Sequence, residues 1–83
     1  MAKIKIVITR LGCKQEAMVF LDGIDLKGLP ETLSSELNEL ASFKDMEEGT
    51  LIYFFQGTTF VERAKNLLFE FSQERNISYE VTE

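Results

Sequence analysis

The stretch TLIYFFQG, residues 50–57, decides the architecture of this chain because it contains five apolar residues in succession. Side chains of a β-strand alternate between two faces, so the odd-numbered residues of this run point to one side and Ile52 and Phe54 to the other. Both sides of the strand therefore need cover, which is typical of a strand inside a sheet. The pattern leaves open which half of residues 51–55 faces the interior.

The segments around this strand alternate at the spacing of strands or repeat at the spacing of helices. In chain order we expect strands at residues 3–11 and 16–23, a helix within residues 28–43, the strand at residues 50–56, a helix of about 17 residues that starts at Thr59, and a strand at residues 77–83. Thr59 and Glu62 have the spacing of a capping box, and Asn76 before Ile77 suits a left-handed helix end. The order ββαβαβ predicts an α/β (α+β) two-layer sandwich, in which right-handed crossovers between sequential strands place both helices on one face of a four-stranded mixed sheet.

Length and composition indicate one small α/β domain, residues 1–83, with 45% hydrophobic residues. The longest apolar run is far shorter than the roughly 20 residues that span a bilayer, and no secretory leader is recognisable, so we expect a cytoplasmic protein without a membrane partner. A single cysteine and no histidine exclude an internal disulfide framework and a Cys/His zinc site. The sequence therefore predicts no cofactor, no metal and no catalytic residues.

The net charge of -5 is unevenly distributed along the chain. Residues 1–14 carry four basic side chains and no acidic one, whereas residues 31–48 carry six acidic side chains and one lysine. The acidic residues of that second segment are Glu31, Glu36, Glu39, Asp45, Glu47 and Glu48. Because a polarised molecule attracts partners of opposite charge, we expect these acids to steer an encounter.

Two helices can cover only one face of the sheet, so apolar side chains remain on the other face. Half of the run at residues 51–55 must lie there, beside alternate residues of the first two strands. Phe69 adds apolar surface because it lies opposite the inner stripe of the second helix. We therefore expect a protein-binding or self-association surface that consists of Val7, Met18, Phe20, Tyr53, Phe55 and Phe69.

An ordinary monomeric core is the alternative to this binding surface. The C-terminal tail, or the loop at residues 22–29 with Ile24 and Leu26, would then fold across the open face and cover it.

Cys13 supports a different hypothesis, a thiol-dependent redox or relay protein, because its cationic neighbours Arg10 and Lys14 favour a reactive thiolate. The stretch TRLGC, residues 9–13, resembles the start of a glutaredoxin-type fold, in which a reactive cysteine opens a helix. That resemblance implies a Cys-x-x-Cys pair, but Glu16 stands in place of the second cysteine. The ββαβ start is also similar to that of ubiquitin-like β-grasp domains, although a C-terminal di-glycine is absent; this implies a topology and no function.

A nucleic-acid interpretation draws on the four basic residues of segment 1–14, with Tyr53 or Phe55 as stacking platforms for single strands. The net negative charge argues against it, because phosphate neutralisation supplies most of such affinity. The acidic segment 31–48 could instead mimic nucleic acid on a basic partner. The interpretation we favour is a non-enzymatic regulatory or adaptor domain whose partner is another protein or a second copy, as in a homodimer.

Overall fold

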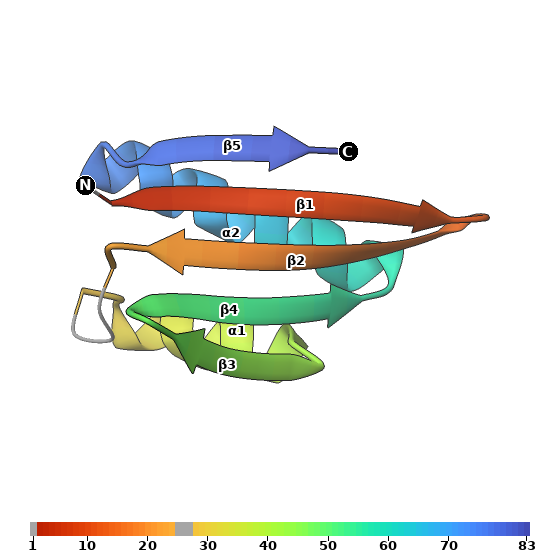
Figure 1. The fold of residues 1–83 in the computed structure, drawn as a ribbon, viewed down its shortest axis with the longest axis horizontal. Helices are drawn as coiled ribbons and strands as arrows, with labels where there is room; N and C mark the ends of the chain where they lie inside the picture. The colour runs from red at the N-terminus through yellow and green to blue at the C-terminus, as the bar shows by residue number, and fades with distance from the viewer. Residues whose placement is uncertain (1, 25–27) are drawn as a thin grey trace.

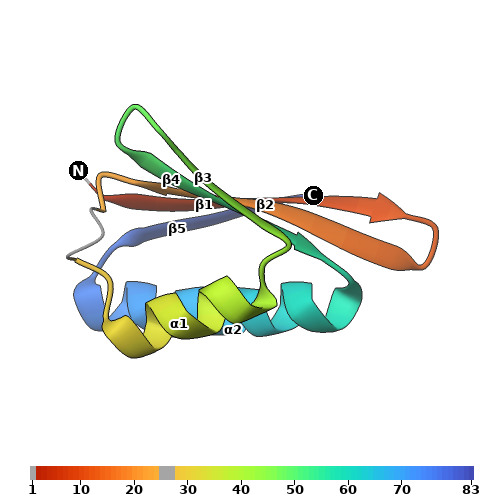
Figure 2. The same ribbon diagram turned by 90° about the horizontal axis from the view of Figure 1, so that it is seen from below.

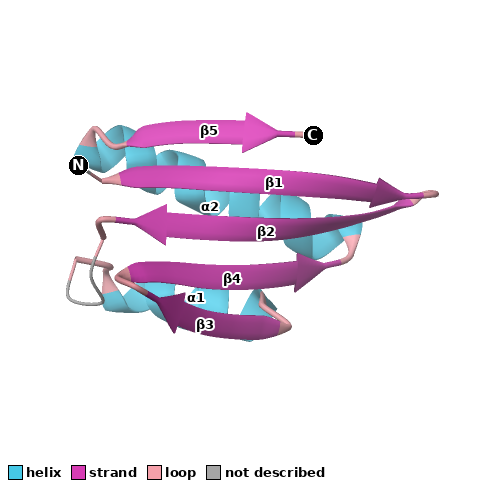
Figure 3. Cartoon of the chain, in the orientation of Figure 1, coloured by secondary structure: helices cyan, strands magenta, loops and turns pink. Residues whose placement is uncertain are grey.

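A computed structural model describes residues 2–24 and 28–83 of the chain as two helices and a five-stranded mixed sheet (Figures 1 and 3). In chain order the elements are β1 (Lys3–Leu11), β2 (Lys14–Asp22), α1 (Glu31–Leu40), β3 (Phe43–Glu47), β4 (Thr50–Gln56), α2 (Thr58–Arg75) and β5 (Ser78–Thr82). The predicted α+β class and the two helices are confirmed, whereas the predicted number of four strands is wrong by one.

The additional strand is β3, which pairs antiparallel with β4 at the edge of the sheet. All five of its residues are exposed, so it lacks the alternation of buried and exposed positions that marks a strand in the sequence. Glu48 and Gly49 connect β3 to β4 with φ angles of 50° and 82°. Positive φ at both residues of a two-residue loop is typical of a type I′ hairpin turn. The stretch DMEEGT, residues 45–50, is therefore a hairpin and not a simple helix exit.

The strand order is β3-β4-β2-β1-β5. β1 pairs antiparallel with β2 and parallel with β5, and β2 pairs antiparallel with β4. β4 and β5 thus run in the same direction, as the crossover through α2 requires, but β2 and β1 lie between them. The expectation that sequential strands are neighbours is wrong here. The central pair is the β1–β2 hairpin, and the later strands add on both sides of it (Figure 1).

Both helices lie on one side of the sheet, as predicted, and the other side carries no helix of the described chain (Figure 2). The core fills the space between the two layers. Its sheet side consists of Ile4, Ile6, Ile8, Ala17, Val19, Leu21, Leu51, Tyr53 and Phe55, and its helix side includes Leu33, Leu37, Val61, Ala64, Leu68 and Phe71. Ile24 and Leu29, from the connection between β2 and α1, also belong to this core.

The C-terminal end of α2 agrees with the prediction from the sequence, whereas its N-terminal end does not. Asn76 adopts the left-handed conformation at the C-cap, and the Ile77 N–H donates to the Ser72 carbonyl oxygen at 2.9 Å, which confirms the predicted helix end. The N-cap is Gly57, and no described side chain caps the helix, so the predicted capping box of Thr59 and Glu62 does not form. Neither helix in the described part of the chain is long and apolar enough to cross a membrane.

Candidate functional site

The face of the sheet that carries no helix, which we call the open face, holds a continuous apolar cluster. Residues that pair across neighbouring strands point to the same face, so the strand register defines which side chains are adjacent. One row across the sheet consists of Asp45, Ile52, Phe20 and Lys5, and the next row consists of Phe43, Phe54, Met18 and Val7. We call the six apolar residues in these two rows the apolar cluster: Val7, Met18, Phe20, Phe43, Ile52 and Phe54.

The side chains of the apolar cluster shield one another only in part. Ile52, at its centre, is 9% exposed although it does not belong to the core under the helices. Val7, Met18, Phe20 and Phe54 are half-buried. Phe43, on the edge strand, is 55% exposed. An apolar cluster that spans four strands and stays open to water is a surface that gains free energy when it is covered.

Charged residues border the apolar cluster on two sides, and the charges differ in sign. Asp45 and Glu47 of β3 lie on the open face at one edge, and Glu48 lies in the adjoining turn. Lys3 and Lys5 of β1 lie on the same face on the opposite side of the cluster. All five side chains are exposed. Across β3, β4, β2 and β1 the open face thus has an acidic border, an apolar middle and a basic border, and Glu80 of the adjoining edge strand β5 pairs in register with Lys5.

Two adjoining hollows lie at the end of the open face next to the β3–β4 turn. The larger has a volume of about 620 Å³ and is lined by Phe20, Glu47, Glu48, Thr50 and Ile52. The smaller has a volume of about 270 Å³ and is lined by Lys3, Lys5, Phe20, Asp22 and Thr50. Phe20 and Thr50 separate an acidic hollow from a basic one. The Thr50 hydroxyl donates to an Asp22 carboxylate oxygen at 3.1 Å, so that carboxylate already has a partner.

Two of the predicted surface residues, Tyr53 and Phe55, are not on the open face. Both are fully buried under the helices, where their rings stack with centroids 6.0 Å apart. The Tyr53 hydroxyl donates to Asn38 Oδ1 of α1 at 3.4 Å, and burial raises the pKa of the phenol above its ordinary value, with a hydrogen bond to Ser34 acting against this. Their assignment to the open face is therefore wrong. Neither ring can stack on a nucleotide base from this position, which removes the predicted platforms for single-stranded nucleic acid.

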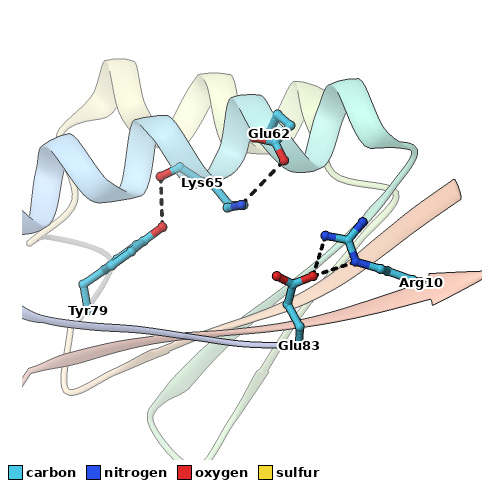
Figure 4. Close-up of polar contacts among 5 residues, drawn as sticks. All are labelled: Arg10, Glu62, Lys65, Tyr79 and Glu83. Carbon is cyan, nitrogen blue, oxygen red and sulfur yellow. Dashed lines mark hydrogen bonds and ion pairs between the residues drawn. The ribbon is translucent and has the colours of Figure 1, made fainter. Parts of the chain in front are cut away.

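Phe69 is exposed, as predicted, but it belongs to a different surface. Its ring lies on α2 and meets the ring of Tyr79 edge to face, with centroids 5.4 Å apart. Tyr79 also donates to the Lys65 carbonyl oxygen at 3.3 Å, on the side of the sheet that the helices cover (Figure 4). Phe69 is thus next to β5 in the helical layer and is not adjacent to Val7, Met18 or Phe20. Those three lie on the open face where the sequence places them.

The six predicted acidic residues form two groups. Glu31, Glu36 and Glu39 lie on α1, in the helical layer, and Glu36 accepts from Arg63 of α2 at 2.9 Å. Asp45, Glu47 and Glu48 belong to the β3–β4 hairpin. Only the second group borders the open face.

Cys13 is exposed in the two-residue turn between β1 and β2. The resemblance to a glutaredoxin-type fold implies a cysteine at the start of a helix, and the turn position does not match it. Arg10, one of the two cationic neighbours, binds the Glu83 carboxylate through its Nε at 2.7 Å (Figure 4). The described residues contain no group of three side chains that could hold a metal ion.

Sequence reasoning missed Ile52, Phe54 and Phe43 as open-face residues. The alternation along residues 51–55 already divides them into two sets, and the register with β2 decides between these sets, because Leu51 pairs with buried Leu21. Phe43 could be assigned only after β3 was known. The alternative of an ordinary core that covers the open face is wrong for Ile24, which lies under the helices; Leu26 lies outside the described residues.

Comparisons with protein families, with curated proteins and with solved structures give no match to this chain.

Proposed function

We propose that this chain is a non-enzymatic protein-binding domain of the adaptor or regulatory kind, which docks a protein partner on the open face of its sheet. The single observation that carries the proposal is the apolar cluster, which extends without interruption across four strands on the face opposite the helices. Covering one Phe or Met side chain is worth on the order of 1.5 to 3 kcal/mol, so a cluster that contains three Phe and one Met provides a substantial driving force for association.

The composition of the open face supports a protein as the partner. Protein interfaces combine an apolar, aromatic-rich centre with a polar border, and aromatic and methionine side chains are enriched there. Phe20, Phe43, Phe54 and Met18 provide that centre. The acidic and basic borders give the surface an orientation, because a partner with the complementary order of charges docks in one direction only.

The test compares two changes that each remove exposed aromatic rings. The double variant Phe43→Ser with Phe54→Ser removes rings from the apolar cluster, whereas Phe60→Ser removes a ring that is 46% exposed on α2, away from the open face. Each variant is immobilised, incubated with a native lysate that also contains untagged copies of the chain, and the retained proteins are identified. The double variant should lose the proteins that the wild type retains, and Phe60→Ser should keep them. Equal retention by the double variant and the wild type would remove the open face as the binding surface.

A further inference from the structure

The open face is complementary to itself, and this follows from the strand register alone. We consider a second copy stacked face to face and related by a two-fold axis that runs along the strands, midway between β2 and β4. Such an axis exchanges the two lateral sides of the sheet and keeps the position along the strands. β2 of one copy then faces β4 of the other, and β1 faces β3.

Every pair of residues that this operation brings together is chemically compatible. In the row that contains Lys5, this lysine meets Asp45 of the second copy, and Phe20 meets Ile52. In the next row, Val7 meets Phe43 and Met18 meets Phe54. In the row on the other side, Lys3 meets Glu47 and Asp22 meets Thr50. The symmetry repeats each contact, so one dimer contains four lysine–carboxylate pairs around a continuous apolar centre.

The charged groups that this arrangement pairs form no ion pairs among the described residues, although an Asp45 carboxylate oxygen accepts a hydrogen bond from the Met46 N–H at 2.8 Å. Among residues 2–24 and 28–83, neither Lys3 nor Lys5 lies within ion-pair distance of a carboxylate, and the same holds for Asp45 and Glu47 with respect to basic groups. The three ion pairs of the described chain all lie elsewhere. The two borders of the open face are therefore available to neutralise each other between copies.

Two other ways to stack the copies place incompatible groups in contact. A two-fold axis across the strands keeps the lateral order, so the acidic border of one copy faces the acidic border of the other. Shifting the axis sideways by half the spacing between strands, so that it lies on β2, brings Glu80 of β5 over Asp45 and Lys5 over Ile52. Of these three arrangements, only the axis between β2 and β4 satisfies both the charges and the apolar cluster.

The twist of the sheet fits the same arrangement. The β3–β4 turn stands away from the helices at one corner of the open face, and β5 lies closer to the helices at the same end of the sheet (Figure 2). The two-fold operation places the raised corner of one copy over the lowered side of the other. Two aligned sheets pack about 10 Å apart with strands rotated by about 30°, and the flexible stem of lysine spans the resulting offset. The acidic hollow beside Glu47 and Glu48 then receives Lys3 of the second copy.

We infer that the open face binds a second copy of this chain in a symmetric, face-to-face dimer with Lys5 against Asp45 and Lys3 against Glu47. This inference rests on the proposed function, because it names the partner that covers the proposed docking surface.

The test uses charge reversal in the purified full chain, with sedimentation equilibrium from micromolar to millimolar concentration. Lys5→Glu places two carboxylates together in each symmetric pair, and Asp45→Lys places two lysines together, so each variant should dimerise at least about tenfold more weakly than the wild type. A 1:1 mixture of the two variants restores opposite charges at both positions. It should form a heterodimer with an affinity close to that of the wild-type dimer.

Two matched reversals control for net charge. Glu74→Lys changes α2, in the helical layer away from the open face, and Lys14→Glu changes the far end of β2. Both should leave the dimer unchanged. A wild-type chain that stays monomeric at millimolar concentration would overturn the second copy as the partner, and so would a dimer that ignores both Lys5→Glu and Asp45→Lys.

The outcome for the dimer can be separated from the outcome for the proposed function. If the purified chain is monomeric but Phe43→Ser with Phe54→Ser abolishes retention of another protein, the inferred dimer fails and the docking face stands. If the chain dimerises and this double variant dimerises equally well, both the inferred dimer and the proposed face fail.

Discussion

The two faces of the sheet are built from the same strands and differ in how they treat their apolar residues. On the face under the helices, Ile4, Ile6 and their neighbours are closed off completely, and no charged residue of the described chain belongs to this core. On the open face, the apolar cluster extends across four strands and stays partly exposed, and carboxylates and lysines lie beside it. The first pattern is that of a domain core and the second that of an interface. Under the proposed function, alternate residues of one strand serve folding and recognition separately.

The largest expected effect separates the two faces by their contribution to stability. Phe55→Ala leaves a cavity under α2 and should lower the free energy of unfolding by about 3 to 5 kcal/mol. Phe43→Ala removes an exposed ring from the open face and should change it by less than about 0.5 kcal/mol. Denaturant unfolding measures both, at a low micromolar concentration that keeps any contribution from dimers small. Equal losses would mean that the open face is part of the folding core.

The next effect concerns the hairpin that carries the acidic border. Gly49 has φ of 82°, and apart from its chain neighbours no described atom lies within 4 Å of the position that a β-carbon would take. Gly49→Ala should therefore introduce backbone strain but no steric clash. The expected loss of stability is about 1 to 2 kcal/mol, the usual difference for a left-handed residue with a side chain.

Glu48→Asn is the control for the hairpin prediction because asparagine tolerates the left-handed conformation that Glu48 adopts. It should keep or slightly raise the melting temperature. Gly49→Ala should also weaken the pairing of β3 with β4, which would expose the open face further without changes under the helices. Amide hydrogen exchange at β3 and β4 measures this loss of pairing. Exchange that accelerates equally in β1 would contradict this separation of the two faces.

The sequence predicted the elements that are periodic and failed for those that are not. The strand at residues 3–11 alternates, the strand at residues 50–56 contains a short continuous apolar run, and the helices carry apolar stripes, so the type of these elements and the one-sided arrangement of the helices could be foreseen. β3 has five exposed residues and therefore no periodicity to detect. The strand order could not be predicted from the sequence either. A helix of the length of α2 can connect β4 to a neighbouring strand or to a strand on the far side of β2 and β1.

The open face was predictable as a consequence of the layer count, but its members were not. Val7, Met18 and Phe20 follow from alternation against the isoleucines of β1. Tyr53 and Phe55 were assigned to the wrong side because the run at residues 51–55 is apolar at every position, and only pairing with β2 distinguishes the two sets. A strand that is apolar on both faces contains no internal signal for its orientation.

The smallest expected effect concerns the face under the helices and is seen in the pH dependence of the free energy of unfolding. The Tyr53 phenol is buried and its hydrogen bond to Asn38 is long, so Tyr53→Phe should cost only about 0.5 kcal/mol at neutral pH. Because burial raises the pKa of Tyr53 in the folded chain, the unfolded chain loses this proton first, near pH 10. The stability that the neutral phenol provides is present below pH 10 and is lost as the pH rises toward the folded pKa.

Tyr53→Phe should therefore flatten the alkaline decline of the unfolding free energy, measured by denaturant titrations between pH 8 and about 11. Tyr79 responds in the same direction, because burial and the nearby Glu62 carboxylate both raise its pKa, so Tyr79→Phe should flatten part of the decline as well. The double variant should be flatter than either single one. Open-face variants such as Phe43→Ala remove no titrating group and should keep the wild-type slope. An unchanged slope in Tyr53→Phe would show that this phenol is in contact with water in the folded chain. The face under the helices would then not be closed to solvent at Tyr53.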